Sequence, residues 1–401
     1  MTPWLSIIGL GEDGLVDLTP GARALVEGAE VLVGGERHFE LIGPTSVECL
    51  AWESPLSKTV ERLAGLEGRR VCVLATGDPM SYGIGVTLIH RFGRDAVVVL
   101  PGLSAFSLAC ARLGWAMAET TQLTLHGRPL DLLHAHLMPG QKLLLLSEDA
   151  TTPAEVARRL TDAGFGPSDI HVLCHMGGPR ERCLSGTAAA GIEENVDNLN
   201  TIAVELVAEP GAKVLARTPG LPDGAFRHDG QMTKREVRAV TLAALSPMPG
   251  QLLWDVGAGC GSVSIEWMRA ADRAAAIAIE HHDGRRAMMA ENAAVLGTPN
   301  LRIVAGSAPD ALQELDAPDA IFIGGGVTAV GVAEMCWDAL ASGGRMVANA
   351  VTLESEKVLM LLHETRGGEL VRLAVSRAKP VGGLTGWRPM MPVTQWRAIK
   401  P

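Results

Sequence analysis

Short apolar runs, each ending near glycine or proline, recur along the first half of the chain. Stretches with the i, i+3, i+4 spacing of amphipathic helices lie between them, for example residues 56–66 and 154–163. This alternation predicts a mainly parallel sheet with helices on its faces. Residues 201–207 are predicted to form the last strand of this half. The preceding runs are 4–9, 71–75, 96–100, 142–146 and 170–174.

The pattern stops over residues 209–230, which contain three prolines, several glycines and no periodicity of helix or strand. Such a segment is typical of a connection between domains. At 401 residues the chain also exceeds the size at which one hydrophobic core usually keeps growing. We therefore predict one domain over 1–210, a linker over 211–230 and a second domain over 231–401.

A second alternation of strands and helices follows the linker. An amphipathic helix is expected over 234–245, and two more strands, 370–376 and 393–399, are expected after the alternation, joined by a loop rich in glycine and proline. Five parallel strands followed by an antiparallel pair indicate an α/β domain of the methyltransferase-type Rossmann class, with a mostly parallel seven-stranded sheet. The two halves share no evident repeat, so different folds are predicted. The five strands are expected at 252–256, 275–280, 301–304, 320–323 and 344–351.

The strongest chemical signal is a strand that opens into Gly257, Gly259 and Gly261 before a predicted helix. Glycines allow a ligand to approach the backbone, and the helix start presents free N–H groups. The spacing is not the G-x-G-x-x-G of dinucleotide sites. Asp255, two residues before the first glycine, favours a cationic sulfonium over a pyrophosphate, and Glu280 ends the next strand, where an acid accepts ribose hydroxyls. We interpret this pattern as an S-adenosylmethionine site; the alternative is a tight structural turn.

Two glycine motifs follow strands in the first half. Gly77-Asp78-Pro79 comes directly after one strand, and residues 101–106, which include Ser104 and Ala105, follow the next. Ligands bind at this edge of parallel sheets. Either motif alone is compatible with a structural turn, but their recurrence favours a site.

Residues 9–14 match G-x-G-x-x-G literally, which raises a nicotinamide or flavin cofactor as an alternative. Glu12 and Asp13 argue against it, because a pyrophosphate requires neutral N–H groups there. A rival of another class is a non-catalytic N-terminal module, for substrate delivery or oligomerisation, beside one working methyltransferase.

The amino-acid composition argues against several classes of binding partner. The formal net charge of −10 argues against nucleic acid, which basic surfaces bind. The seven cysteines form no CxxC pair, and the adjacent His281 and His282 cannot both face one site, so no metal is predicted. Neither a signal peptide nor an apolar run of about 20 residues is present, which predicts a cytoplasmic protein without a membrane partner.

These residues resemble two families. Residues 1 to about 210 are similar to the tetrapyrrole methylases, through the first glycine loop, the Gly77-Asp78-Pro79 turn and the Pro101-Gly102-x-Ser104 segment. Residues from about 228 resemble the decarboxylating methyltransferases of cobalamin biosynthesis, through Thr233-Lys-Arg-Glu-Val-Arg238 and the 255–261 loop. Two departures are Cys260, where threonine is more usual, and Glu12-Asp13 in place of Pro-Gly.

The resemblance implies one S-adenosylmethionine per domain and no metal. Its site residues would be Thr233, Asp255, Gly257, Ala258, Gly259, Cys260, Gly261, Glu280 and Ala308 in the second domain, and Gly9, Gly77, Asp78, Pro79, Ser104 and Ala105 in the first.

The substrate would be a tetrapyrrole, precorrin-6Y, methylated at carbons 5 and 15 and decarboxylated at the carbon-12 acetate to give precorrin-8X. Arg235, Arg238 and Arg285 are candidate partners for its carboxylates, although each fits an ordinary helix charge equally well. A homo-oligomer, dimer or tetramer, is also implied.

Overall fold

The computed structural model describes residues 3–192 and 195–401. The chain forms two compact units, each described here by itself. Unit 1 comprises Met1–Arg128 and Met138–Lys213, and unit 2 comprises Pro129–Leu137 and Val214–Pro401. Within the predicted linker, Leu221 and Phe226 are buried in the core of unit 2. The linker boundaries themselves stay a prediction.

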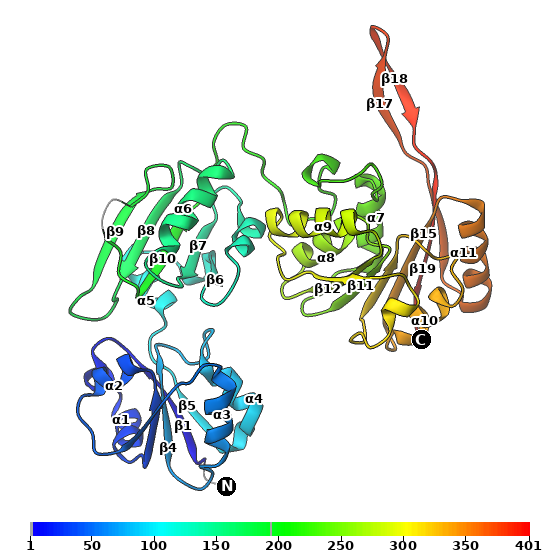
Figure 1. Cartoon of the computed structure of the whole chain (residues 1–401). Coiled ribbons are helices and arrows are strands. Elements are labelled where there is room, and N and C mark those ends of the chain that lie inside the picture. Colours follow the sequence, from blue (N-terminus) through cyan, green and yellow to red (C-terminus); the bar gives the residue numbers. More distant parts are fainter. Residues whose placement is uncertain (1–2, 193–194) are drawn as a thin grey trace. The chain divides into compact units, whose positions relative to one another are not determined.

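The first layer of unit 1 is a parallel five-stranded sheet in the order β3-β2-β4-β1-β5 (Figure 1). Helices α1 and α2 pack on one face, and α3 and α4 pack on the other. Strands β1, β2 and β4 are almost entirely buried, as expected for strands covered on both faces. The elements are β1 (Leu5–Leu10), α1 (Pro20–Glu27), β2 (Val31–Gly34), α2 (Glu36–Ile42), β3 (Glu48–Ala51), α3 (Leu56–Ala64), β4 (Val71–Thr76), α4 (Ile84–Phe92) and β5 (Val97–Leu100).

The rest of unit 1 corrects the expectation of a single, mainly parallel sheet. A second five-stranded sheet has the order β6-β7-β10-β8-β9, and only its β6–β7 pair is parallel. The connection over 175–181 from β8 to β9 is too short for a crossover helix, so these strands pair antiparallel. The elements are α5 (Ala105–Leu113), β6 (Thr120–Thr124), β7 (Lys142–Leu146), α6 (Thr152–Asp162), β8 (Asp169–Cys174), β9 (Arg182–Thr187) and β10 (Asn200–Glu205).

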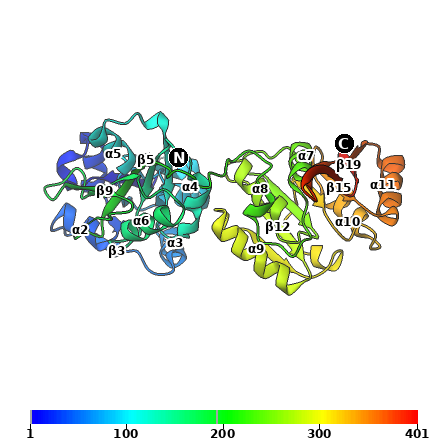
Figure 2. The same ribbon diagram turned by 90° about the horizontal axis from the view of Figure 1, so that it is seen from above.

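Unit 2 is built on the predicted seven-stranded sheet, in the order β13-β12-β11-β14-β15-β19-β16, with β19 antiparallel to both neighbours. Helices α7, α8 and α9 lie toward one face, and α10 and α11 toward the other (Figure 1; Figure 2 gives the same unit seen from above). The elements are α7 (Arg235–Leu245), β11 (Leu252–Val256), α8 (Ser262–Ala270), β12 (Ala275–Glu280), α9 (Asp283–Val295), β13 (Arg302–Ala305), β14 (Ala320–Ile323), α10 (Val332–Ala339), β15 (Arg345–Ala350), α11 (Leu353–Arg366), β16 (Glu369–Leu373) and β19 (Val393–Ile399).

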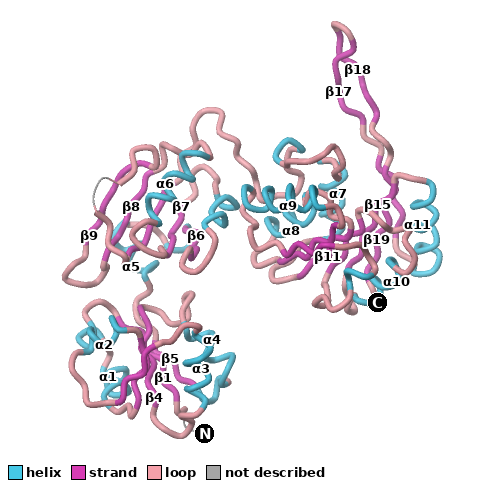
Figure 3. The backbone as a smooth tube through the Cα atoms, viewed as in Figure 1, coloured by secondary structure: helices cyan, strands magenta, loops and turns pink. Residues whose placement is uncertain are grey.

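The loop expected between the last two strands is instead a two-stranded hairpin, β17 (Ser376–Val381) and β18 (Leu384–Pro389), seen in Figure 3 as a long arm. The tight turn at Gly382-Gly383 explains why a glycine-rich segment still pairs as strands. Val381, Leu384 and Trp387 are 65%, 80% and 78% exposed on this arm.

Unit 2 also includes a short 3-10 segment, Leu130–His136, from within the sequence of the first half. Nδ1 of His134 lies 3.1 Å from the carbonyl oxygen of Ala294 at the end of α9. A Cβ on Gly297 would lie 2.2 Å from the backbone nitrogen of Ala135, so only glycine fits there. No helix in the described part of the chain is long and apolar enough to cross a membrane.

Candidate active sites of the two units

The end of β1 and the loops after β4 and β5 meet at three glycines in unit 1. A Cβ on Gly9 would lie 1.9 Å from the carbonyl oxygen of Gly77 and 2.2 Å from the nitrogen of Gly102. Gly77 adopts φ +59°, and its oxygen accepts a hydrogen bond from the Gly102 N–H at 3.0 Å. The three predicted loops therefore form one junction that excludes any side chain.

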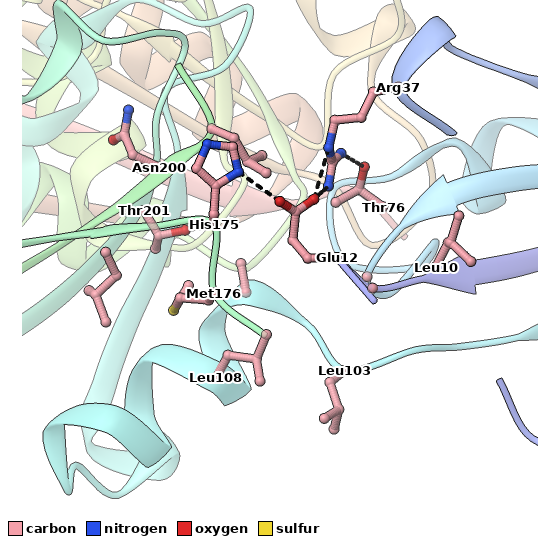
Figure 4. A pocket seen from close by; sticks show the side chains of 15 residues that line it. Leu10, Glu12, Arg37, Thr76, Leu103, Leu108, His175, Met176, Asn200 and Thr201 are labelled. Carbon is pink, nitrogen blue, oxygen red and sulfur yellow. Dashed lines mark hydrogen bonds and ion pairs between the residues drawn. The ribbon is translucent and has the colours of Figure 1, made fainter. Parts of the chain in front are cut away.

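A half-open pocket lies beside this junction (Figure 4). Two predicted site residues, Gly77 and Ala105, line it. The first sheet and the second sheet of unit 1 both contribute to its wall. The remaining lining residues are Leu10, Gly11, Glu12, Arg37, Thr76, Leu103, Leu108, Leu173, His175, Met176, Leu199, Asn200 and Thr201.

The other predicted residues of unit 1 support the pocket without lining it. Asp78 Oδ1 accepts a hydrogen bond from the N–H of Met80 at 2.8 Å, which closes the turn. Ser104 is the N-cap of α5, and its Oγ accepts from the Ser107 N–H at 3.1 Å. Pro79 is buried next to the turn. The turn and the cap hold the loops that bear Gly77 and Ala105.

A chain of charged groups crosses the pocket. Glu12, from the loop after β1, accepts hydrogen bonds from Nε of Arg37 at 3.0 Å and is 2.7 Å from Nδ1 of His175 (Figure 4). Arg37 also donates to Oγ1 of Thr76 at 3.2 Å. Burial opposes ionisation of Glu12, but the bonds and charges of Arg37 and His175 outweigh it and hold its pKa below the usual value.

The sequence analysis missed Arg37 and His175, because they lie far from the glycine loops in the sequence and only the fold brings them together. The one available signal was Glu12 itself. A carboxylate that is buried in a glycine loop requires hydrogen-bonding or charged partners, and Arg37 and His175 are those partners.

In unit 2, Asp255 is 1% exposed and anchors the start of α8. Its Oδ2 accepts hydrogen bonds from the N–H and Oγ of Ser264 at 3.1 and 2.6 Å. Its Oδ1 has no partner among the described residues, and burial raises the pKa of Asp255 to about 6. Asp255 therefore organises the loop, and its predicted attraction for a sulfonium stays a prediction.

Glu280 is 3% exposed at the end of β12. One carboxylate oxygen accepts from the Gly259 N–H at 2.9 Å and the other from the His282 N–H at 2.9 Å. These bonds tie the end of β12 to the glycine loop and fix the carboxylate. Nδ1 of His281 also lies 3.2 Å from one of these oxygens, whereas the oxygen bound to Gly259 has no other partner among the described residues and keeps a lone pair for a ribose hydroxyl.

The glycine loop of unit 2 contacts the loop after β14. Gly257 has φ +72°, and a Cβ there would lie 2.8 Å from the backbone nitrogen and Cα of Gly325. Gly259 and Gly261 also have positive φ. Ala258, between Gly257 and Gly259 in the sequence, is half-buried. The two glycine loops therefore come together at the carboxyl end of β11 and β14, where ligands bind in such sheets.

The remaining predicted residues differ in role. Cys260 is 2% exposed in the core beneath the loop, where burial raises the pKa of its thiol. Thr233 and Ala308 are half-buried. Among the described residues no three side chains of His, Cys, Asp or Glu are grouped as metal ligands.

Arg238 cannot be a partner for substrate carboxylates. Its side chain is fully buried, and its Nε donates to Oε1 of Glu266 at 2.6 Å. Its other nitrogens donate to the carbonyl oxygens of Thr233 and Leu221. Arg285 is engaged as well, with Nε donating to Asp229 at 2.8 Å. Arg235 is exposed.

Two family profiles match the chain. Residues 5–190 match the tetrapyrrole (corrin/porphyrin) methylases, and residues 224–400 match the precorrin methyltransferase domain. The chain is thus an S-adenosylmethionine-dependent C-methyltransferase with two methyltransferase domains.

A precorrin-6Y C(5,15)-methyltransferase (decarboxylating) of Sinorhizobium sp is 47% identical over 401 residues, which cover 100% of this chain and 97% of the relative. The chain belongs to the family of decarboxylating precorrin-6Y C(5,15)-methyltransferases of cobalamin biosynthesis.

Two shorter relatives each match less than half of the chain. A cobalt-precorrin-7 C(5)-methyltransferase of Salmonella typhimurium is 30% identical over 162 residues, 40% of this chain and 80% of the relative. A probable cobalt-precorrin-6B C(15)-methyltransferase (decarboxylating) of Pyrobaculum aerophilum is 33% identical over 183 residues, 44% of this chain and 93% of the relative.

Proposed function

We propose that the two units divide the reaction: unit 1 methylates carbon 5 of the tetrapyrrole, and unit 2 methylates carbon 15 and removes the carbon-12 carboxylate as carbon dioxide. The observation that carries this proposal is that each unit has its own glycine junction at the carboxyl end of parallel strands. The two shorter relatives support it, because their names assign the two methylations to separate proteins.

We further propose one S-adenosylmethionine site per unit. In unit 1 the pocket beside Gly77 and Ala105 would hold it, and in unit 2 Glu280 and the 257–261 loop would hold it. When bound, this cosubstrate supplies the methyl group. The residues around it fix its orientation, because the glycine junctions permit close approach and the carboxylate of Glu280 is already held by two backbone N–H groups.

The protein's main contribution to methyl transfer is alignment. The methylated carbons belong to electron-rich, enamine-like systems, so no strong base is needed to create the nucleophile. Holding the reacting groups in line lowers the barrier by roughly 7 to 11 kcal/mol at best.

The division is tested with two full-length variants. Ala105→Phe fills the pocket of unit 1, and Glu280→Ala removes the proposed ribose acceptor of unit 2. Each is incubated with S-adenosylmethionine and the reduced corrin precursor, and the products are weighed by mass spectrometry. Ala105→Phe is expected to lose the methylation of carbon 5 and to retain the methylation of carbon 15 and the decarboxylation. Glu280→Ala is expected to impair the methylation of carbon 15 and the decarboxylation.

Full methylation by Ala105→Phe would instead favour the rival in which unit 1 is a non-catalytic module. The ion pairs of Glu12 in the wall of this pocket favour a working site in unit 1, since an oligomerisation module needs no such groups.

We also propose that the chain forms a homo-oligomer. Three large apolar side chains of the β17–β18 hairpin are more than half exposed, and the described strands of this hairpin pair with each other alone. Exposed apolar patches of this kind mark association sites. Trp387→Ser with Leu384→Ser is expected to lower the mass measured by light scattering, and an unchanged mass would exclude the hairpin as the contact.

A further inference from the structure

Methylation at a ring carbon that carries hydrogen releases a proton. The new carbon–methyl bond forms as the carbon–sulfur bond of the donor breaks, and the ring becomes cationic. The carbon–hydrogen bond then breaks, its electron pair returns to the conjugated ring, and a proton must leave. A group that lines the site and accepts this proton, with a route that carries it away, therefore completes the reaction.

Unit 1 has a row of groups suited to this task. His175 is 7% exposed and lies between two carboxylates: Nδ1 is 2.7 Å from Oε2 of Glu12, and Nε2 is 3.9 Å from Oδ2 of Asp197. The side chain of Glu12 is 8% exposed and lines the pocket, whereas that of Asp197 is 41% exposed. The imidazole thus separates a pocket carboxylate from a solvent-exposed one.

Both carboxylates are held in place by arginines. Arg37 binds Glu12 through two nitrogens, and Arg182 from β9 donates to Oδ2 of Asp197 through Nε and Nη2 at 3.1 and 2.8 Å. Among the described residues, the charged groups that contact the His175 ring are these two carboxylates, and each of them is bound by an arginine. A fixed carboxylate on each side of an imidazole is a geometry suited to proton transfer across its ring.

The backbone at His175 is also unusual. Its φ of +47° lies in the left-handed region, which a residue with a Cβ adopts only when its surroundings enforce it. Gly178 makes room for the contact, since a Cβ there would lie 2.4 Å from Cβ of Glu12. The loop after β8 is thus shaped to bring His175 to Glu12.

We propose that Glu12, His175 and Asp197 form a relay that carries the proton released by methylation out of the unit 1 pocket. Glu12 accepts the proton from the methylated ring carbon and passes it to Nδ1 of His175. The imidazole then releases the proton on Nε2 to water at the solvent-exposed side of the ring, where the carboxylate of Asp197, 3.9 Å away, stabilises the cationic imidazole. The cationic ring is a strong acid, so a carboxylate with a lowered pKa is a sufficient acceptor. This inference rests on the proposed methylation of carbon 5 by unit 1.

The experiment uses the full chain, S-adenosylmethionine and a precursor with hydrogen or deuterium at carbon 5, followed by rapid mass spectrometry. His175→Asn removes the relay but tolerates a left-handed φ. It is expected to slow steady-state formation of the neutral carbon-5 product, which requires loss of the proton, about 10²-fold, and to make that rate depend on deuterium, unlike the rate of the unchanged protein. The carbon-15 methylation and decarboxylation by unit 2 are expected to keep their rates.

His171→Asn is the matched control, because His171 lies on β8 and contacts Ser185 outside the pocket. His175→Gly tests the chemistry directly: it tolerates the same φ and leaves space in which added imidazole is expected to restore the rate. A merely structural role would give no isotope effect and no rescue.

Equal rates for His175→Asn and the unchanged protein, with no isotope effect, would overturn the relay. If His175→Asn does not fold, Asp197→Asn decides: an unchanged rate and no isotope effect would overturn the relay, and a slower carbon-5 step with an isotope effect would support it. If the unchanged protein adds no methyl at carbon 5, the proposed function of unit 1 fails instead, and the two failures are thereby distinguished.

Discussion

The two units build similar loops by different means. In unit 2 the glycine loop is tied down by buried carboxylates, with Asp255 bound to Ser264 and Glu280 bound to the N–H of Gly259. In unit 1 the loops are held by backbone contact among glycines, and the nearby carboxylate, Glu12, binds side chains from other elements. The carboxylates of unit 2 thus order the loop itself, whereas that of unit 1 remains part of the pocket wall.

The largest expected effect lies beneath the loop of unit 2. Arg238→Ala should destabilise the folded state by about 3–5 kcal/mol, because it leaves the buried carboxylate of Glu266 without an opposite charge and with backbone N–H donors alone. Chemical denaturation followed by tryptophan fluorescence would measure this. Arg397→Ala is the control. It removes an ion pair between Arg397 and Glu369, whose side chains are 38% and 67% exposed, and should lower the free energy of unfolding by about 1 kcal/mol or less.

Asp255 should give unit 2 a pH dependence with the opposite sign to that of most carboxylates. Burial raises its pKa to about 6 from 3.8, so the folded state binds the proton more tightly than the unfolded state. Its contribution to stability is therefore complete below pH 4 and is lost as the pH rises to about 6, by up to about 3 kcal/mol.

Asp255→Asn lacks this loss, so relative to the unchanged protein it should be more stable at pH 7.5 than at pH 4.5. Denaturation of both proteins at the two pH values measures the difference. A stability difference independent of pH would mean that Asp255 titrates normally.

Glu280→Ala should weaken binding of S-adenosylmethionine to unit 2 by about 1.5–3 kcal/mol, the usual cost of lost charge-assisted hydrogen bonds. Calorimetry on Ala105→Phe, whose unit 1 pocket is blocked, isolates the unit 2 site. Binding of the same affinity with and without Glu280 would show that this carboxylate does not contact the ligand.

The glycine junction of unit 1 offers a matched pair. Gly9→Ala should destabilise the unit by about 1–3 kcal/mol, because its Cβ would meet the Gly77 oxygen at 1.9 Å. Gly11→Ala should have little effect, since the nearest atom to its Cβ would be 3.7 Å away. Thermal unfolding of the two variants compares their stabilities. Equal losses of stability would mean that the backbone around Gly9 shifts to accommodate the added Cβ.

The sequence predicted unit 2 more completely than unit 1. Strands 252–256, 275–280 and 320–323 were located to the residue, since buried parallel strands read as unbroken apolar runs. The second sheet of unit 1 was not foreseen, because apolar runs do not reveal the direction of pairing.

The candidate sites show the same limit. Glycine loops are local in sequence and could be located, whereas Arg37 and His175 reach Glu12 only through the fold. Arg238 was a candidate for the substrate because a helix pattern does not show which arginine is buried.

The membership of Pro129–Leu137 in unit 2 has a consequence during synthesis. This segment leaves the ribosome well before Gly297, whose missing Cβ makes room for Ala135. At about 5–20 residues per second, the nascent chain must wait on the order of ten seconds before the binding partner of this segment exists. During that interval the side chains of Leu130, Leu132 and Leu133 have no native partner in unit 2 and stay exposed on the growing chain.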